Sequence, residues 1–217
     1  MKTTISVLLV DDHAVVREGY RRLLEQRSDI RVVGEAGNAA EACQRFAELA
    51  PDVVVMDIGL PGVSGIEAMR RMLAREPAAR VLVFSMHDDG VYVARALQAG
   101  ALGYVSKASA PDVLVDAVHS VARGARYLSR DVAQGLALQS GAADESPLKT
   151  LSAREFEVLR LLLQGMALAD IGVKLGLTTK TVANHQSAVR HKLGAESGAQ
   201  LVHIAQRLGV IAAPRPA

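Results

Sequence analysis

The first part of the chain alternates short apolar runs with longer stretches in which apolar residues recur at helical spacing. The runs predict β-strands at residues 5–10, 30–36, 52–57, 80–85 and 101–106. Three of them contain continuous apolar segments, which is typical of parallel strands covered on both faces. The stretches between and after the runs predict helices at roughly 14–27, 38–50, 64–75, 88–99 and 111–123. This alternation predicts an α/β fold, a doubly wound five-stranded parallel sheet.

Residues typical of helix starts support three helical patterns. Ser64 and Glu67 have the spacing of a capping box before the third helix, and Ser152 and Glu155 have the same spacing before a helical pattern further along. Pro111 suits the first turn of the fifth helix, because a proline there loses no helical hydrogen bond. We therefore expect helices to begin close to these positions.

The chain after residue 125 is patterned differently. Residues 126–138 could form one more helix, and QSGAADESP at 139–147 has the composition of a linker. The rest is patterned for helices only, at residues 152–165, 167–176, 178–194 and 197–209. The sequence thus predicts a domain at 1–125, a partly helical linker at 126–147 and a small all-α domain of four helices at 148–213.

Composition limits the class of protein. The chain has 217 residues, of which 50% are hydrophobic and 22% charged, as in globular proteins. Its single cysteine, Cys43, excludes an internal disulfide framework and a cysteine-based zinc site. No apolar stretch approaches the length of a membrane span, and the run at 5–10 is too short for the core of a signal peptide. We expect a cytoplasmic protein without a membrane partner.

Charge is distributed unevenly. Residues 1–140 hold 16 Lys and Arg against 17 Asp and Glu, whereas residues 141–217 hold nine against six. The basic surplus in the smaller part suggests a polyanionic partner there, although a solvated basic face would give the same counts. Charge alone therefore does not decide between the two.

Polar residues stand at the carboxyl ends of four predicted strands. They are Asp11 and Asp12 after the first strand, Asp57 at the third, Ser85 at the fourth and Lys107 after the fifth. The carboxyl ends of parallel strands share one edge of the sheet, where ligands bind in this architecture. Three carboxylates at one place need a cation, and an all-oxygen set favours Mg²⁺ over zinc or copper. We expect a magnesium site at this edge.

The same residues suggest phosphoryl chemistry. A carboxylate beside Mg²⁺ and an ammonium group is equipped to attack a phosphoryl group and hold it as an acyl phosphate. Ser85 can donate a hydrogen bond to a phosphoryl oxygen. Each residue also has a simpler explanation, because Asp11 and Asp12 could cap a helix, Ser85 could lie in a turn, and Lys107 could be a solvated surface lysine. Their joint occurrence favours a phosphoryl site centred on Asp57.

Residues 1–125 resemble the receiver domain of response regulators. The resemblance rests on the acidic pair Asp11–Asp12, on MDIGLPG around Asp57, on Ser85, and on GYVSK, which contains Tyr104 and Lys107. It implies a flavodoxin-like sheet with strand order 2-1-3-4-5. It also implies that a sensor histidine kinase transfers a phosphoryl group to Asp57.

The receiver resemblance also implies roles for the surrounding residues. Asp12, Asp57 and the backbone carbonyl of Gly59 would bind Mg²⁺, and Asp11 would help to hold the metal site. Lys107 would contact the phosphoryl group, Ser85 would close on it, and Tyr104 would rotate inward as the readout. Gly59 and His87 occupy positions that tune hydrolysis of the phosphoryl group in this family.

The second domain contains the pattern of a helix-turn-helix at about 168–187, whose second helix would be free to enter a major groove. Any small helical bundle could share this spacing. The candidate DNA-binding residues are Thr179, Lys180, Thr181, Ala183, Asn184, Ser187, Arg190 and Lys192. Asn184 suits a base edge, whereas Lys180, Arg190 and Lys192 suit phosphates.

Residues 151–194 are similar to the LuxR-type DNA-binding domain, through LSAREFEVL, the QGM turn, and TV followed by His185 before HKLG. With the receiver, this identifies the chain as resembling the NarL/FixJ class of response regulators. The resemblance implies double-stranded DNA as a partner and a homodimer on DNA, formed through the last helix at about 197–209. Ala183 stands where some members carry a DNA-contacting lysine.

The leading interpretation is a phosphorylation-controlled transcription factor that is not an enzyme acting on a separate substrate. A Mg²⁺-dependent phosphatase with an aspartyl phosphate is an alternative, but such enzymes usually carry two carboxylates as DxD on one strand, and here they are split between two. A nucleotide-binding enzyme is disfavoured, since the sequence has no GxGxxG after the first strand and no GxxxxGK. A DNA-binding protein whose receiver only dimerises is a third possibility.

Overall fold

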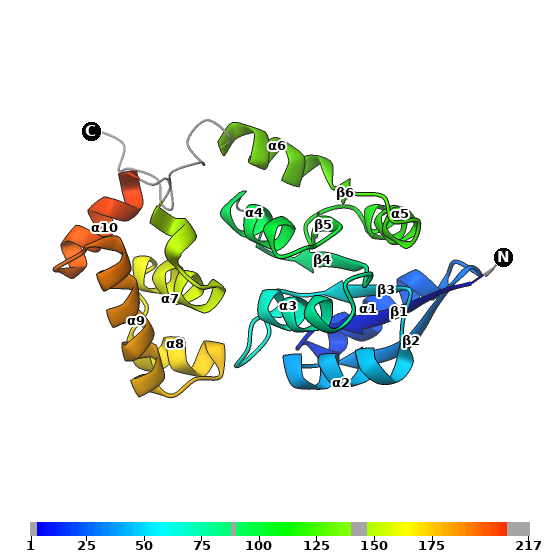
Figure 1. Cartoon of the computed structure of the whole chain (residues 1–217), viewed down its shortest axis with the longest axis horizontal. Helices are drawn as coiled ribbons and strands as arrows, with labels where there is room; N and C mark the ends of the chain where they lie inside the picture. Colours follow the sequence, from blue (N-terminus) through cyan, green and yellow to red (C-terminus); the bar gives the residue numbers. More distant parts are fainter. Residues whose placement is uncertain (1–3, 88–89, 140–146, 208–217) are drawn as a thin grey trace. The chain divides into compact units, whose positions relative to one another are not determined.

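The computed structural model describes residues 4–87, 90–139 and 147–207 of the chain. The chain forms two compact units, Met1–Gly141 and Ala142–Ala217, which are coloured blue to green and yellow to red in Figure 1. Among the described residues, no helix combines the length and the apolar run that crossing a membrane requires.

The first unit is built on one parallel sheet. Its strands are β1 (Ile5–Val10), β2 (Ile30–Ala36), β3 (Val53–Met56), β4 (Val81–Ser85), β5 (Gly103–Ser106) and β6 (Tyr127–Leu128), in the order β2-β1-β3-β4-β5-β6. The implied order of the first five strands is confirmed. The sheet has six strands, however, so the prediction of five was wrong. A two-residue strand is too short to give a periodic signal in the sequence.

Five helices connect and cover the strands (Figure 1). They are α1 (Ala14–Glu25), α2 (Ala39–Leu49), α3 (Gly65–Arg75), α4 (Gly90–Gln98) and α5 (Pro111–Ala122). Leu24 of α1 and Val118 of α5 share one buried cluster with Val55 of β3 and Leu82 of β4. Since alternate residues of a strand point to opposite faces, α1 and α5 lie on one face of the sheet, and α2, α3 and α4 cover the other.

The helix-start signals have different outcomes. Ser152 and Glu155 form the predicted capping box, with bonds of 3.2 Å and 2.6 Å to each other's backbone amides, and Pro111 is the first residue of α5. The box predicted at Ser64 is wrong, because the Ser64 side chain makes no capping hydrogen bond. Its hydroxyl is instead buried without a partner, and Glu67 pairs with Arg71 on the helix surface at 3.2 Å.

The predicted linker starts too early. β6 pairs with β5, and the next helix, α6 (Arg130–Gln139), contacts α4 and β5. Val132 of α6 is completely buried. These residues therefore extend the first unit beyond the expected boundary at 125, and residues 140–146 of the predicted linker lie outside the described residues.

The second unit contains the four predicted helices after a short 3₁₀ turn, η1 (Pro147–Thr150). They are α7 (Ala153–Leu163), α8 (Leu168–Leu175), α9 (Thr179–Leu193) and α10 (Gly198–Arg207). Its core includes Val158, Ile171 and Val182. The ends predicted at 209 for the last helix and 213 for the domain lie outside the described residues.

Glycine makes the turn between α8 and α9 possible. Gly176 ends α8 with a φ of 63°, a conformation that favours glycine. A Cβ added to Gly172 would lie 2.8 Å from the carbonyl oxygen of Leu177, so the chain returns closely over α8. A short turn therefore joins the two helices, as the helix-turn-helix pattern predicts.

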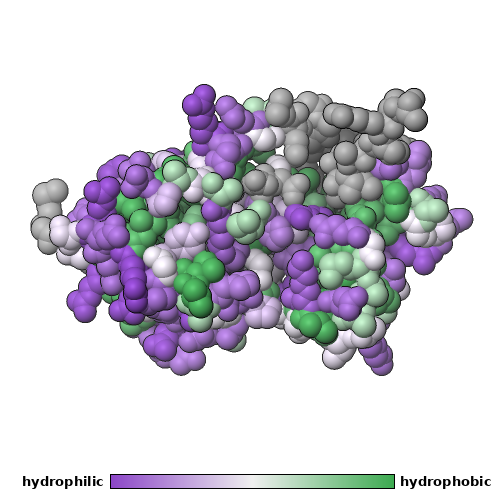
Figure 2. All heavy atoms as spheres, turned by 180° about the vertical axis from the view of Figure 1, so that it is seen from behind, coloured by the Kyte–Doolittle hydropathy of each residue, from purple (hydrophilic) through white to green (hydrophobic). Residues whose placement is uncertain are grey.

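The surface is mixed in character. In the space-filling view of Figure 2, hydrophilic side chains predominate and apolar ones form small separate areas. Val15, Met86 and Val173 are among the exposed large apolar residues. Val15 follows the acidic pair after β1 and Met86 follows β4, so both lie near the carboxyl edge of the sheet, where the candidate site is found.

Candidate functional sites

The carboxyl ends of β1, β3 and β5 bring three charged side chains together. The Lys107 ammonium lies 2.5 Å from Asp11 Oδ2 and 2.5 Å from Asp57 Oδ2. The side chains of Asp11, Asp57 and Lys107 are only 3%, 9% and 7% exposed. Such a cluster is costly to bury unless its members pair. The simple explanation of Lys107 as a surface lysine is therefore wrong.

The second carboxylate oxygen of Asp57 is held by neutral donors. Ser85 Oγ donates to Asp57 Oδ1 at 2.9 Å, and the Gly59 amide donates to the same oxygen at 3.1 Å. Both oxygens of Asp57 thus face groups that can stabilise negative charge. Groups of this kind are also suited to the oxygens of a phosphoryl group bound to Asp57.

Lys107 stays charged in this setting. Burial lowers the pKa of the Lys107 ammonium, but attraction to Asp57 and hydrogen bonds to Asp11 and Asp57 outweigh burial, and the pKa is raised above its ordinary value. The ammonium also lies 5.9 Å from the centre of the Phe84 ring, within range of a cation–π interaction. Two carboxylates against one ammonium leave an excess negative charge.

The acidic turn after β1 can hold a cation. Ligand atoms of Asp11, Asp12 and His13 all lie within 4.8 Å of one another. The His13 amide donates to Asp11 Oδ1 at 2.8 Å, and His13 Nδ1 lies 2.8 Å from Asp12 Oδ1. Carboxylate oxygens and a local excess of negative charge fit Mg²⁺. The Asp11 and Asp57 carboxylates flank the Lys107 ammonium, and Asp12 directly follows Asp11 in the chain, so the three residues fit a shared metal site.

Ser85 and Tyr104 are joined through the backbone of His87. The His87 amide donates to Ser85 Oγ at 3.3 Å, and the hydroxyl of the fully buried Tyr104 donates to the His87 carbonyl oxygen. The His87 ring stacks on Tyr92 of α4, with centroids 4.6 Å apart. Ser85 therefore already contacts Asp57, and Tyr104 already points inward.

The candidate recognition helix is α9 in the second unit. The Thr178 side chain caps it by accepting from the Thr181 amide at 3.1 Å. Among the candidate DNA-binding residues, Thr179, Lys180, Asn184 and Ser187 are exposed, and Thr181 and Ala183 are half-buried. The Ser187 hydroxyl donates to the Ala183 carbonyl oxygen at 3.0 Å. An exposed polar stripe thus runs along the first half of α9.

The C-terminal part of α9 is tied to its own domain. Lys192 Nζ lies 2.7 Å from Glu155 Oε2, and Arg190 donates to the carbonyl oxygens of Ala195, at 3.3 Å, and Glu196. Burial raises the pKa of Glu155, but hydrogen bonds from Lys192 and Ser152 outweigh it and lower that pKa. Arg190 and Lys192, expected at DNA phosphates, therefore have partners within the domain, which the sequence pattern alone did not reveal.

Known proteins match both units. The response regulator receiver domain matches residues 7–119, and the luxR family of bacterial regulatory proteins matches residues 149–205. The chain is 38% identical to the response regulator UvrY of Escherichia coli (strain K12) over 208 residues, 95% of each chain. It is 37% identical to the response regulator GacA of Pseudomonas syringae pv. syringae over 209 residues, 95% of this chain and 98% of the relative.

The chain belongs to the response regulators. With a receiver followed by a LuxR-type DNA-binding domain, it is of the NarL/FixJ class and regulates transcription. A solved LuxR-family response regulator from Aurantimonas is 47% identical, with a TM-score of 0.62, over 64% of this chain and 99% of the other. RcsB from Salmonella enterica serovar Typhimurium, solved on the rprA promoter with phosphomimetic BeF3⁻, is 27% identical, with a TM-score of 0.64, over 93% of this chain and 98% of RcsB.

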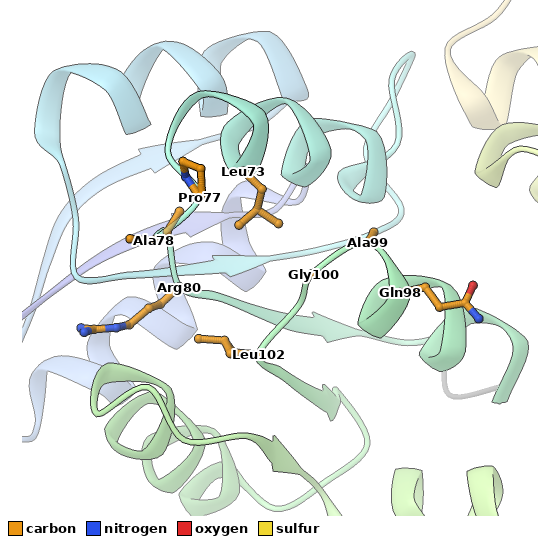
Figure 3. A pocket seen from close by; sticks show the side chains of 9 residues that line it. Leu73, Pro77, Ala78, Arg80, Gln98, Ala99, Gly100 and Leu102 are labelled. Atoms are coloured by element: carbon orange, nitrogen blue, oxygen red, sulfur yellow. The ribbon is translucent and has the colours of Figure 1, made fainter.

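The response regulator also has a cavity of about 470 Å³ at the opposite edge of the receiver sheet. Figure 3 shows it between the C-terminal ends of α3 and α4, with Leu73, Pro77 and Gly100 around it. Arg80 lines it too, but its guanidinium donates to the Ala122 carbonyl oxygen at 2.8 Å. The cavity lies at the amino ends of β4 and β5, away from Asp57.

Gly65 supports the candidate site at Asp57, a role that the sequence pattern did not predict. A Cβ at Gly65 would lie 1.9 Å from the carbonyl oxygen of Asp57 and 2.9 Å from its carbonyl carbon. The first residue of α3 therefore packs directly on the Asp57 backbone, and the Gly65 amide donates to the Ile58 carbonyl oxygen at 3.0 Å. The available signal was a glycine after the turn at Pro61–Gly62, where a close backbone approach is possible.

Replacing Gly65 with alanine should destabilise the receiver. Because the clashing atoms are backbone atoms, α3 or Asp57 must move, at a cost of about 1–3 kcal/mol in the free energy of unfolding. Gly19→Ala is the matched control, since nothing lies within 4 Å of its added Cβ, and an alanine at this exposed position inside α1 should stabilise by about 0.5–1 kcal/mol. Equal denaturant midpoints for the two variants would show that the close approach at Gly65 is unimportant.

Proposed function

We propose that the response regulator accepts a phosphoryl group on Asp57 and that this modification controls DNA binding by its second domain. The observation that carries the proposal is the setting of Asp57, whose two oxygens face the Lys107 ammonium, the Ser85 hydroxyl and the Gly59 amide. A sensor histidine kinase supplies the phosphoryl group. Both this kinase's phosphorylated domain and the DNA are cytoplasmic, so we place the protein there.

The transfer needs few groups from the protein. A carboxylate oxygen of Asp57 attacks the phosphorus atom, the bond from phosphorus to the donor's leaving nitrogen breaks, and the leaving group takes the electron pair. Lys107 then moves its charge from the carboxylates towards the phosphoryl oxygens, and Ser85 donates a hydrogen bond to one of them. The protein promotes its own phosphorylation and the later hydrolysis of the phosphoryl group, and it acts on no separate substrate.

The acidic residues would hold the metal for this step. Asp11, Asp12, Asp57 and the Gly59 carbonyl oxygen would bind Mg²⁺, which would offset the excess negative charge around the phosphoryl group. Without a cation, a phosphoryl group would approach a cluster that is already negative. Metal binding and phosphorylation are therefore linked by charge.

Intact mass in the presence of a small phosphodonor tests the proposal. We expect one added phosphoryl group per chain with Mg²⁺ and none with excess chelator, because the carboxylates need the metal to accept an anion. Peptide mapping should place the group on Asp57. Full labelling in chelator would contradict the role of the metal.

Phosphorylation would shift an equilibrium that the receiver already has. Ser85 and Tyr104 already lie in the inward arrangement that the family couples to phosphorylation. A phosphoryl group on Asp57 would accept hydrogen bonds from Ser85 and Lys107 in that arrangement, so it would increase the population of that arrangement. The path from Tyr104 through His87 to Tyr92 leads to α4.

The second domain would bind DNA through α9 as a homodimer. The exposed residues Thr179, Lys180, Asn184 and Ser187 would enter the major groove, with Thr181 and Ala183 beside them. RcsB, a structural relative, has been solved as two dimers on DNA. Two copies of α9 in a dimer would read half-sites about 34 Å apart, one turn of the duplex. Arg190 and Lys192 would mainly hold the end of α9, through their bonds within the domain.

Asn184→Ala and Lys180→Ala should have different effects on DNA binding. An asparagine amide can bond adenine N6 and N7 together, so its loss should cost about 1–3 kcal/mol on the preferred duplex and relax preference at one position. Loss of Lys180 should weaken binding to all sequences alike and flatten the salt dependence. Titrations on a preferred and a scrambled duplex at two salt concentrations measure both. If Asn184→Ala weakens both duplexes equally, Asn184 does not read a base.

A further inference from the structure

Arg17 of α1 connects the acidic turn to the end of β2. Its Nη1 donates to the carbonyl oxygen of Asp11 at 2.6 Å, and its Nε donates to Glu35 Oε2 at 2.8 Å. The Arg17 side chain is 18% exposed. Arg21 also donates to the Glu35 carboxylate, at 3.2 Å. The planar guanidinium therefore donates to two groups at once, the Asp11 backbone and the Glu35 side chain.

The contact of Arg17 falls on the peptide group that links Asp11 to Asp12. The Asp11 amide, which precedes this peptide group in the chain, donates to the Ala36 carbonyl oxygen at 3.0 Å, just past the end of β1. The carbonyl oxygen of the Asp11–Asp12 peptide group itself accepts from Arg17 Nη1 at 2.6 Å. The orientation of this peptide group determines where Asp12 projects from the turn.

Gly37 lies beside the guanidinium, at a distance where an added Cβ would make only ordinary contact. A Cβ at Gly37 would lie 3.7 Å from Arg17 Nη1 and 4.0 Å from the Asp11 carbonyl oxygen. The ammonium of a lysine at position 17 could not replace both bonds, because it is a single point on a flexible stem. Only the arginine fork spans Glu35 and the Asp11 backbone together.

We propose that Arg17 is a positioning residue for the metal site: it fixes the peptide group between Asp11 and Asp12 and thereby sets the affinity of the receiver for Mg²⁺. The inference rests on the proposed function of this site, and it assigns Arg17 no contact with the metal or the phosphoryl group. Residues that orient metal ligands typically change metal affinity by about 10- to 100-fold when they are replaced.

Charge and position make opposite predictions for Arg17. If Arg17 acted only by its positive charge, Arg17→Gln would strengthen Mg²⁺ binding by removing a repelling cation, and Arg17→Lys would leave it unchanged. If Arg17 positions the turn, both variants weaken Mg²⁺ binding. Arg22→Gln is the control for lost charge, because Arg22 lies on the same helix, is 78% exposed and pairs only with Glu18 among the ion pairs of the described residues.

Calorimetric titration of the full chain with Mg²⁺ alone, without phosphodonor, tests the inference. We expect the dissociation constant to rise about tenfold in Arg17→Gln and Arg17→Lys and to stay unchanged in Arg22→Gln. Glu35→Gln, which weakens the hold on Arg17 but keeps an acceptor, should give a smaller rise in the same direction. Glu35→Gln serves as the test if circular dichroism shows that the Arg17 variants are unfolded.

The possible failures are distinguishable. Unchanged or tighter Mg²⁺ binding in folded Arg17 variants, or in Glu35→Gln if those variants do not fold, would overturn the positioning role alone. A wild-type chain that binds no Mg²⁺ would overturn both this inference and the proposed metal site. Weakening of the same size in Arg22→Gln would also overturn it, since the effect would then not depend on the contact with Asp11.

Discussion

The Asp57→Asn variant is expected to gain no mass from a phosphodonor and Mg²⁺, under conditions in which the wild-type chain gains one phosphoryl group. An amide lacks the anionic oxygen that attacks phosphorus, so the loss should be complete rather than partial. Intact mass spectrometry measures it directly. Undiminished labelling of the variant would show that another residue is the acceptor.

Loss of labelling should not result from loss of the fold. The oxygen of an asparagine at position 57 can still accept from Ser85 and Gly59, as Asp57 Oδ1 does. Lys107 keeps its contact with Asp11. Circular dichroism and thermal unfolding of the variant should therefore resemble those of the wild type, and a molten variant would make the labelling result uninformative about chemistry.

Lys107→Met is expected to destabilise the metal-free receiver by about 3–5 kcal/mol, because it leaves two buried carboxylates facing each other without their cation. Denaturant unfolding in chelator measures this loss. The raised pKa of Lys107 means that its stabilising contribution is fully present below the ordinary lysine pKa and is lost only as pH rises through the raised folded-state pKa. Lys107 is therefore fully charged at neutral pH, where the wild type and Lys107→Met are compared.

Mg²⁺ should restore part of that stability. The metal supplies the missing positive charge to Asp11 and Asp57, so the free energy of unfolding should rise more with Mg²⁺ in Lys107→Met than in the wild type. Lys174→Met, at an exposed position on α8, is the control and should change neither quantity. If Lys107→Met is as stable as this control in chelator, the ammonium does not hold the carboxylates together.

The arrangement of the candidate site at Asp57 could be predicted because the positions of strand ends follow from the topology of the sheet. Once the apolar runs indicated a parallel sheet, Asp57, Ser85 and Lys107 had to approach one edge, and the structure places them there. The pattern could not show that Lys107 would contact both Asp11 and Asp57. Side-chain reach and burial determine that contact, and neither has a periodic signal.

Other features depend on contacts between segments far apart in the sequence. The two-residue strand β6 exists because β5 offers it an edge. The capping box expected at Ser64 is absent, and the Ser64 hydroxyl is buried in the packed structure instead. Lys192 appeared free in the sequence but pairs with Glu155 from another helix. In each case tertiary packing overrode a local rule.

The role of Arg17 was missed for a related reason. An arginine in an amphipathic helix pattern is usually read as part of a solvated face. Its two hydrogen bonds join α1 to the backbone of Asp11, six residues earlier, and to Glu35 of β2, 18 residues later. Only the folded arrangement shows that this side chain faces the acidic turn.

The central claim is that a phosphoryl group on Asp57 controls DNA binding by α9. One titration tests it: wild type and Asp57→Asn, each with and without phosphodonor and Mg²⁺, on a duplex selected from random sequence by the phosphorylated protein, with the labelled fraction checked by mass in the same samples. We predict that phosphodonor changes the affinity of the wild type by about 5- to 150-fold, the usual range of coupling between two sites, and leaves Asp57→Asn unchanged. Equal affinities for fully labelled and unlabelled wild type would contradict the claim.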